Sequence, residues 1–252
     1  MKQARFMMGM PVTVEIIDPQ VTEEVFNEIF DYFMHIDERF STYKPTSEIS
    51  AINAGTLTPG DASEEMQLVL AMCEETKRET GGYFDIKNPD GKLDPSGIVK
   101  GWAIWNAAKL LEKIGFENFY IDAGGDIQPH GHNADGKKWT VGIKNPFDQN
   151  ENIKIIHAGN EGVATSGTYI RGLHIYNPRS GNRPANEIVS LTVIGPNIHD
   201  ADRFATAAFA MGMDGINFIE QLPGYEGYMI DKNKIATMTS GFEKFTGSRA
   251  GA

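Results

Sequence analysis

Five short segments with strand character follow one another directly, and this run constrains the fold more than any other feature of the chain. They lie at 119–122, 126–130, 139–143, 154–158 and 162–166. Apolar residues at helical spacing mark three segments before this run, at 21–40, 63–80 and 98–114. Runs of strands beside runs of helices, without regular βαβ units, are typical of α+β folds. We therefore expect an α+β protein with a core of antiparallel strands.

The remaining segments extend this pattern to both ends of the chain. A strand is expected at 5–17, and the polar stretch 37–53 is rich in turn-forming residues. After the central run we expect a strand at 188–194, an Ala-rich helix, a short helix at 216–221, and a hairpin of 225–230 with 234–238. The terminal residues 247–252, GSRAGA, are expected to be a disordered tail.

Composition excludes several classes of function. The 252 residues carry a net charge of −11, which argues against sequence-independent binding of nucleic acid. Cys73 is the only cysteine, so the chain can have neither an internal disulfide nor a cysteine-based metal site. The sequence has no apolar run long enough to span a membrane and no signal peptide at its start. We expect a cytoplasmic location for the chain as it stands, or a periplasmic one if a leader has been removed.

The Ala-rich segment 201–212, ADRFATAAFAMG, carries an unusual polar pair. Asp202 and Thr206 are four residues apart, so in a helix both side chains lie on one face. A carboxylate and a hydroxyl form a pair of hard oxygen donors, and Mg²⁺ prefers such ligands. The alternative is structural, with Asp202 complementing the helix dipole and Thr206 bonding back to a carbonyl oxygen.

Two further segments combine glycine or aromatic residues with polar ones. In 41–50, STYKPTSEIS, Tyr43 and Ser47 could face a ligand, although the segment by itself favours a solvated loop. In 81–86, GGYFDI, Asp85 follows two aromatic residues and a glycine pair. This arrangement could hold a planar heterocycle, or it could open a strand.

Two more segments place polar groups where an anion could bind. In 93–104, LDPSGIVKGWAI, Asp94 lies at an expected helix start and Lys100 about one turn inside the helix. Helix N-termini favour anions and a nearby lysine adds charge, so a phosphate cradle is one interpretation and an ordinary cap with a surface lysine the other. The segment 162–181 carries Thr165, Ser166 and His174. His174 could act in a cleft or be structural, and a Ser–His hydrolase is disfavoured because no GxSxG elbow is present.

Taken together, these segments resemble the FAD:protein FMN transferases of the ApbE type. The resemblance spans almost the whole chain and follows the order of the family's motifs, which read here MGM, the 43–53 loop, GGYFD, LDPSGIVKGWA, IDAGGDI, VATSGTY, HIYNPRSG and ADRFATA. It implies one domain over residues 1–246, with a T-fold-like core of antiparallel strands packed with helices and a smaller flanking subdomain.

The resemblance also implies a reaction. Such enzymes bind FAD with Mg²⁺ and transfer its FMN portion to a threonine hydroxyl of a partner flavoprotein, releasing AMP. Some members instead cleave FAD to FMN and AMP, so a pyrophosphatase remains an alternative, as does a protein that binds FAD without catalysis. The identity of the acceptor and the choice between monomer and dimer are left open.

The family's site residues can be carried over position by position. The resemblance implies flavin-binding positions at Met8, Tyr43, Tyr83, Phe84, Asp85, Asp94, Lys100 and Ile175, with Thr165 and Ser166 as part of the wall of the site. It implies metal ligation by the side chains of Asp202 and Thr206 and by backbone oxygens near Gly97 and Ala205. His174 falls on the catalytic histidine, and Asp202 is catalytic through the metal.

Three departures from the family pattern affect this assignment. Met10 stands where the first motif usually has threonine, and Asn177 stands where HIxDP has aspartate. The lipoprotein leader that is common in the family is not present in this sequence. The two substitutions lie beside the expected site and leave its expected ligands in place.

Overall fold

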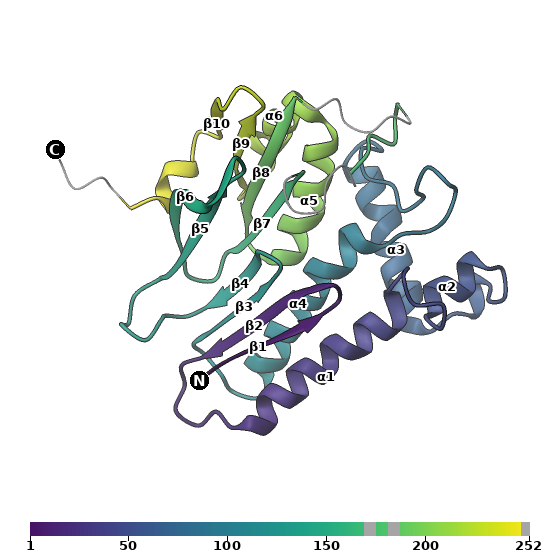
Figure 1. Cartoon of the computed structure of the whole chain (residues 1–252), viewed down its shortest axis with the longest axis horizontal. Helices are drawn as coiled ribbons and strands as arrows, with labels where there is room; N and C mark the ends of the chain where they lie inside the picture. The colour runs from purple at the N-terminus through teal and green to yellow at the C-terminus, as the bar shows by residue number, and fades with distance from the viewer. Residues whose placement is uncertain (169–174, 181–186, 248–252) are drawn as a thin grey trace.

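An eight-stranded antiparallel sheet forms the centre of the computed structural model, which describes residues 1–168, 175–180 and 187–247 (Figure 1). Every neighbouring pair of strands in this sheet is antiparallel. Its strand order is β1 (Lys2–Met7), β2 (Met10–Ile16), β3 (Phe119–Ala123), β4 (Asp126–His130), β7 (Gly162–Gly167), β8 (Ile188–Gly195), β9 (Glu226–Asp231) and β10 (Ala236–Met238). The predicted α+β class, built on antiparallel strands, is confirmed.

Helices cover one face of this sheet (Figure 1). Helix α4 (Ser96–Lys113) packs on β3 and β4, and α5 (Ile198–Ala210) packs on β7 and β8. Helix α1 (Glu23–Phe40) packs against α4, since its apolar residues recur every three or four positions and bury one stripe. The shorter elements are α2 (Glu48–Asn53), η1 (Pro59–Asp61), α3 (Glu64–Glu79), η2 (Gly212–Asp214), α6 (Gly215–Glu220) and η3 (Phe242–Phe245).

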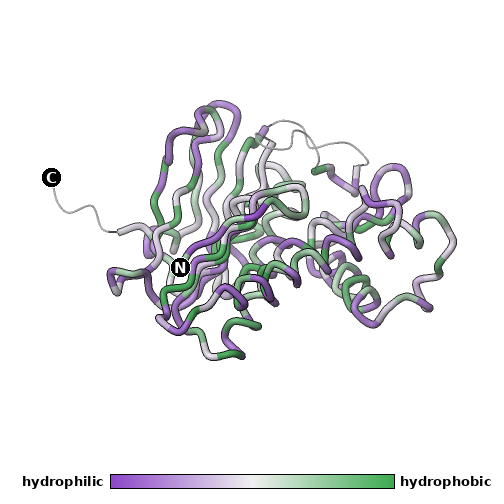
Figure 2. Tube along the Cα trace, turned by 60° about the horizontal axis from the view of Figure 1, so that its bottom comes forward, coloured by the Kyte–Doolittle hydropathy of each residue, from purple (hydrophilic) through white to green (hydrophobic). Residues whose placement is uncertain are grey.

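The opposite face of the sheet carries a second, smaller sheet. Strands β5 (Trp139–Asn145) and β6 (Asp148–Ala158) form this hairpin, and η3 packs beside it. A small apolar cluster that includes Ile127, Ile156 and Phe242 lies between the two layers. Because β4 is covered on both faces, four of its five residues are buried. Along β2, by contrast, buried and less buried residues alternate. Figure 2 shows hydrophobic and hydrophilic residues following one another along the strands.

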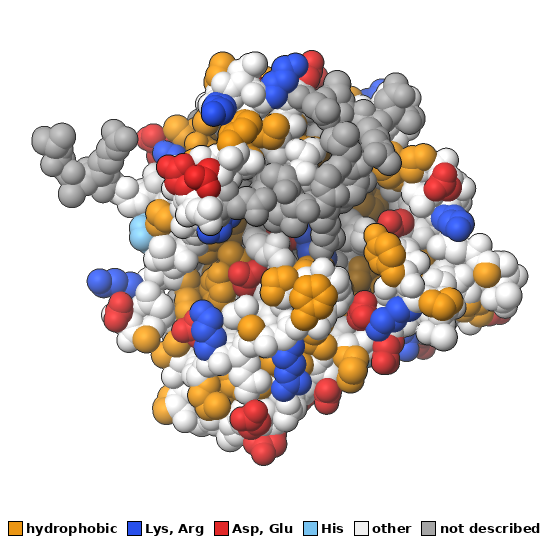
Figure 3. Space-filling model, viewed as in Figure 1, with side chains coloured by type: hydrophobic (Ala, Val, Ile, Leu, Met, Phe, Trp, Pro, Cys, Tyr) orange, Lys and Arg blue, Asp and Glu red, His pale blue; other side chains and the backbone are white. Residues whose placement is uncertain are grey.

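Side chains of both charges are interspersed on the described part of the face shown in Figure 3. Among the described residues, no helix combines the length and the apolar character that crossing a membrane requires. Of the predicted tail, only Gly247 lies within the described residues. The expected single domain over 1–246 remains a prediction.

One prediction about the first third of the chain was wrong, and one short helix there was not predicted. The segment 5–17 is not one strand, because the chain reverses at Met8 and Gly9 between β1 and β2. Both residues have positive φ, +51° and +74°, as a two-residue type I′ turn requires, and Met–Gly is not among the dipeptides that normally signal it. The stretch 37–53 contains α2, whose N-cap Ser47 accepts a hydrogen bond from the amide of Ser50.

Candidate functional site

A pocket opens where the N-terminal half of α4, helix α5, strand β7 and the segments 83–85 and 175–178 meet. It has about 1000 Å³ of empty space when the solvent at its open mouth is included. Most of the predicted site residues line it together: Tyr83, Phe84, Asp85, Asp94, Gly97, Lys100, Thr165, Ser166, Ile175, Asp202 and Thr206. The fold therefore joins motifs that lie more than a hundred residues apart in the sequence.

Helix α5 supplies two oxygen donors to the pocket, Asp202 and Thr206, which are called the oxygen donors below. Its N-cap Asn197 accepts a hydrogen bond from the amide of Asp200, which fixes the start of the helix three residues before the predicted 201. Asp202 and Thr206 then lie one turn apart and both reach the pocket. Asp202 is only 3% exposed, although it is an acidic residue on a helix. A carboxylate so deeply buried is rarely left without partners.

Close packing of α4 on α5 gives Asp202 its first partner. The amide nitrogen of Gly101 donates to Oδ2 of Asp202 at 2.9 Å. A Cβ atom at residue 101 would lie 2.7 Å from Cβ of Asp202 and 2.8 Å from the carbonyl oxygen of Ile198. Glycine at this position therefore permits the approach of the two helices that holds the carboxylate in place.

Lys100 provides the second partner and connects two acidic side chains. Its Nζ forms an ion pair with Asp126 and lies 3.4 Å from Oδ1 of Asp202. Asp126 is 1% exposed and also accepts a hydrogen bond from the amide of Thr165 at 2.9 Å. Burial raises the pKa of Asp202, the charge on Lys100 lowers it, and the charge on Asp126 raises it further.

The donors in this part of the pocket fit a small divalent cation. Asp202 and Thr206 offer a carboxylate and a hydroxyl, and Gly97 from α4 lies so close that its Cβ would be 3.3 Å from Cγ2 of Thr206. Among the described residues, no group of three His, Cys, Asp or Glu side chains could hold a metal ion. One carboxylate completed by ligand oxygens and water is typical of Mg²⁺ bound to a phosphorylated substrate. Magnesium binding remains a prediction.

An aromatic wall of the pocket, formed by Tyr83 and Phe84, lies on the segment that follows α3. Gly81 and Gly82 have φ of +60° and +82°, and this turn directs Tyr83 and Phe84 into the pocket. A Cβ atom at Gly97 would lie 3.0 Å from the ring of Phe84, so this ring packs directly on the start of α4. Thr206 also lies beside Gly97, so the aromatic wall adjoins the oxygen donors Asp202 and Thr206 in one pocket.

The segment 175–178 closes another side and is tied to the aromatic wall. The hydroxyl of Tyr176 donates to the carbonyl oxygen of Lys87 at 2.5 Å. Burial, followed by the charges of Asp85 and Asp94, raises the pKa of Tyr176 to about 12. The guanidinium of Arg179 lies 5.0 Å from the ring centre of Tyr83, within the range of a cation–π contact.

The predicted residues that do not line this pocket lie in different surroundings. Met8 occupies the β1–β2 turn, Tyr43 is 95% exposed, and Ala205 is fully buried. Their assigned roles remain predictions. His174, the predicted catalytic residue, lies outside the described residues.

Both departures from the family pattern have a clear structural place. Asn177 accepts a hydrogen bond from the amide of Arg179 at 3.0 Å, a turn geometry that an aspartate would also support. Met10 is buried, and a Cβ atom at Gly124 would lie 3.0 Å from its sulfur. Met10 therefore packs directly beneath the turn whose Gly124 lines the pocket.

Sequence reasoning assigned no role to several pocket residues. Asp126 is the most consequential, because it holds both Lys100 and the amide of Thr165. Its position directly after a Gly–Gly pair at a strand start was the available signal, since such a turn can bring a side chain next to another motif. The other unassigned lining residues are Gly124, Gly167, Tyr176 and Pro178.

Comparison with known proteins identifies the family of this chain. An FAD:protein FMN transferase of Haemophilus influenzae is 24% identical over an alignment 309 positions long. The alignment covers 95% of this chain and 89% of that protein. One of Vibrio cholerae is 36% identical over 133 residues, covering 49% and 40%. The solved flavin transferase ApbE from Vibrio cholerae has a TM-score of 0.85 at 24% identity, covering 97% of this chain and 98% of that one.

A second solved structure and the family's sequence model agree with this result. The ApbE protein from Thermotoga maritima has a TM-score of 0.84 at 22% identity, covering 98% of this chain and 99% of that one. The sequence model of the ApbE family matches residues 8–89 and 87–229. These ranges include both sides of the pocket described above, and the chain therefore belongs to the ApbE family.

Proposed function

We propose that the chain transfers the FMN portion of FAD to a threonine hydroxyl of a partner flavoprotein in a magnesium-dependent reaction that releases AMP. The relatives named as FAD:protein FMN transferases support the general activity. One observation about the pocket carries the proposal further. The oxygen donors Asp202 and Thr206, with Lys100 beside them, share a single pocket with the aromatic residues Tyr83 and Phe84. Such a pocket suits a ligand that joins a planar ring to a diphosphate.

The proposed reaction is a displacement at phosphorus. The acceptor's threonine oxygen bonds to the phosphorus atom on the FMN side of the diphosphate. The bond between that phosphorus and the bridging oxygen breaks, and AMP leaves with the oxygen. The hydroxyl proton passes to a base, for which His174 is our candidate from the sequence. General-base assistance of this kind is worth about 10²–10⁴-fold in rate.

The chain's own groups would stabilise and orient the diphosphate. The ammonium of Lys100, fixed by the buried carboxylate of Asp126, places a positive charge at the pocket without free rotation of its side chain. Bound Mg²⁺ would supply Lewis-acid neutralisation of the phosphate oxygens, with Asp202 and Thr206 as its protein ligands. Tyr83 and Phe84 would hold the ring system by stacking.

Intact-mass measurement tests this proposal directly. The protein is incubated with FAD, Mg²⁺ and an acceptor protein that carries the target threonine, and nucleotide products are separated by chromatography. The expected result is an acceptor heavier by one FMN, with an equal amount of AMP released. An acceptor with valine in place of the threonine, and a reaction with excess EDTA, are the controls and should give neither product.

The same experiment separates the alternatives. Release of FMN and AMP at equal rates with and without the acceptor would identify a pyrophosphatase instead. Bound FAD that is recovered intact after long incubation would identify a binding protein without catalysis. Either outcome would contradict the proposed transfer.

A further inference from the structure

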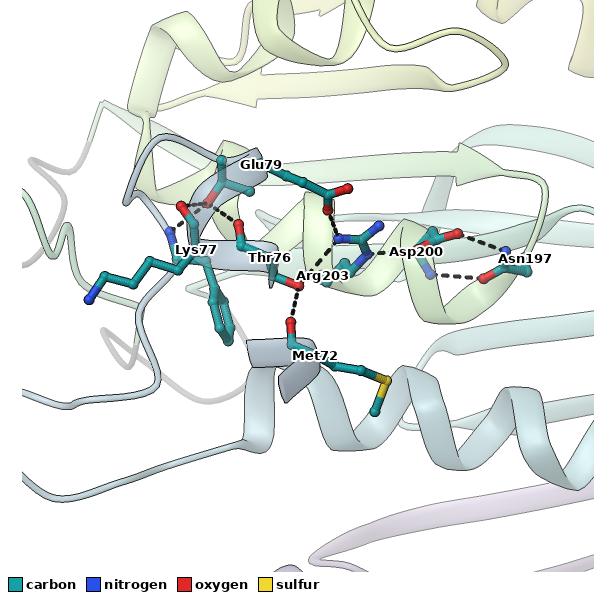
Figure 4. Close-up of polar contacts among 9 residues, drawn as sticks. Met72, Thr76, Lys77, Glu79, Asn197, Asp200 and Arg203 are labelled. Atoms are coloured by element: carbon teal, nitrogen blue, oxygen red, sulfur yellow. Dashed lines mark hydrogen bonds and ion pairs between the residues drawn. The ribbon is translucent and has the colours of Figure 1, made fainter. Parts of the chain in front are cut away.

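Arg203 connects helix α5, which carries Asp202 and Thr206, to the end of helix α3, which the aromatic wall follows in the chain. It follows Asp202 in the chain but points to a different side of α5, because successive helical residues are turned by about 100°. Its Nε donates to Asp200 at 2.7 Å, and one terminal nitrogen donates to the hydroxyl of Thr76 at 3.2 Å and pairs with Glu79 (Figure 4). The arginine side chain is only 12% exposed.

The end of α3 that Arg203 contacts also supports the aromatic wall. The hydroxyl of Thr80 donates to the carbonyl oxygen of Thr76 at 2.7 Å and accepts from the amide of Phe84 at 3.2 Å. The amide of Gly82 donates to the carbonyl oxygen of Lys77 at 2.8 Å. The segment that bears Phe84 is therefore built on the last turn of α3, and a shift of that turn would move the wall.

The α5 end of this connection is equally fixed. The side-chain amide of Asn197 donates to Asp200 at 2.9 Å, and the amide of Asp200 donates back to the oxygen of Asn197 at 2.9 Å (Figure 4). The acceptor for Arg203 therefore belongs to the capped first turn of the helix that carries the oxygen donors of the pocket.

We propose that Arg203 is a positioning residue that sets the separation between the aromatic wall and the oxygen donors of the pocket. It has no place among the pocket-lining residues, so it acts through α3 and not by touching the substrate. The inference rests on the proposed function, since it assumes that FAD spans these two walls. Arginine suits the role because its planar guanidinium presents several N–H donors in a fixed geometry, and here they reach Asp200, Thr76 and Glu79.

Substitution should weaken FAD binding more than it slows the chemical step. In Arg203→Gln the dissociation constant for FAD, followed by flavin fluorescence, should rise about tenfold. The kcat for transfer at saturating FAD should change less than threefold, because Asp202 keeps its contacts with α4. Arg203→Lys should recover part of the affinity, since it retains a charge that can pair with Glu79 or Asp200.

Arg39→Gln is the matched control. Arg39 also links helices through a partly buried guanidinium, with its Nε 3.3 Å from Glu65 near the start of α3. Its loss disturbs the opposite end of the same helix, far along the chain from the aromatic wall. Thermal unfolding of both variants measures their loss of stability, and the FAD affinity of Arg39→Gln should stay within twofold of wild type.

Thr76→Val tests the same connection by a smaller change. It removes one acceptor for Arg203 and keeps the volume of a buried side chain, so it serves if Arg203→Gln does not fold. Its FAD affinity should fall about threefold. Wild-type FAD affinity in Arg203→Gln, or in a folded Thr76→Val if the first variant is lost, would overturn the inference. An equal loss of affinity in Arg39→Gln would also overturn it. A wild-type protein that binds no FAD would instead refute the proposed function on which the inference rests.

Discussion

Replacement of Gly101 by alanine sets two physical effects against each other. Alanine in a helix interior is favoured over glycine by about 1 kcal/mol. The new Cβ, however, would lie 2.7 Å from Cβ of Asp202 and 2.8 Å from the carbonyl oxygen of Ile198, and both neighbours belong to the packed helix α5. Overpacking of this kind costs about 1–3 kcal/mol, and two rigid neighbours favour the upper end. We expect a net loss of about 2 kcal/mol.

This loss predicts a measurable shift in two assays. The thermal midpoint, followed by circular dichroism, should fall by about 4–8 °C, because each kcal/mol is worth about 2–4 °C in a domain of this size. The shift of α5 also disturbs the hydrogen bond from the amide of Gly101 to Asp202. Loss of such an outer-sphere partner typically weakens metal binding by about tenfold, so the Mg²⁺ concentration for half-maximal AMP release should rise accordingly.

Gly159→Ala is the control, since its Cβ would meet only side-chain atoms at 3.8 and 3.9 Å. It should leave the midpoint and the Mg²⁺ dependence nearly unchanged. A Gly101→Ala protein with a raised or unchanged midpoint would refute the reasoning, because helix propensity would then outweigh the contact between α4 and α5.

Three further predictions concern single side chains. Lys100→Met should lower the free energy of unfolding in urea by about 3 kcal/mol, because it leaves the buried Asp126 carboxylate without its positively charged partner. Adding Asp126→Asn should restore much of this stability, and no recovery in the double variant would contradict this account. His174→Ala should keep FAD affinity within threefold and reduce the transfer rate about 10²–10⁴-fold, and a wild-type rate would remove His174 from the mechanism. Burial lowers the pKa of His199 below 6.5, so its contribution to stability is full above pH 6.5 and is lost as the pH falls through the lower folded-state value. His199→Gln should therefore flatten the fall in urea stability between pH 7.5 and 5, and a slope equal to wild type would exclude this residue as its source.

The elements with strong periodicity were the ones that sequence could predict. Helices α1, α3 and α4 begin and end within two residues of the predicted bounds, since apolar spacing marks all three and glycines follow α3 and α4. The β1–β2 hairpin was missed because a methionine adopts positive φ at its turn, which no local pattern signals. Helix α2 was missed because it is only six residues long and buries few side chains. Tertiary contacts stabilise both elements.

The pocket shows a similar division. Residue types and spacing alone could single out groups that are informative in themselves, such as the Asp202–Thr206 pair. Asp126 and Arg203 were not predicted, because the role of each depends on a partner elsewhere in the sequence. Asp126 pairs with Lys100, and Arg203 donates to Thr76. A sequence read in short windows shows an acid after two glycines and a basic residue on a helix. Their roles follow from the tertiary structure, which brings Asp126 to Lys100 of α4 and Arg203 of α5 to Thr76 of α3.

Apart from Gly124, the residues that line the pocket come from two distant parts of the chain, within 83–100 and 165–206. During synthesis the first part emerges long before the second, so the complete pocket cannot exist until α5 has docked on α4. A ligand that bridges both parts would bind only the finished fold, and by mass action it would add about 2.7 kcal/mol of stability at a concentration of one hundred times its dissociation constant. Flavin supply would then influence how much folded protein persists in a cell as well as how fast that protein works.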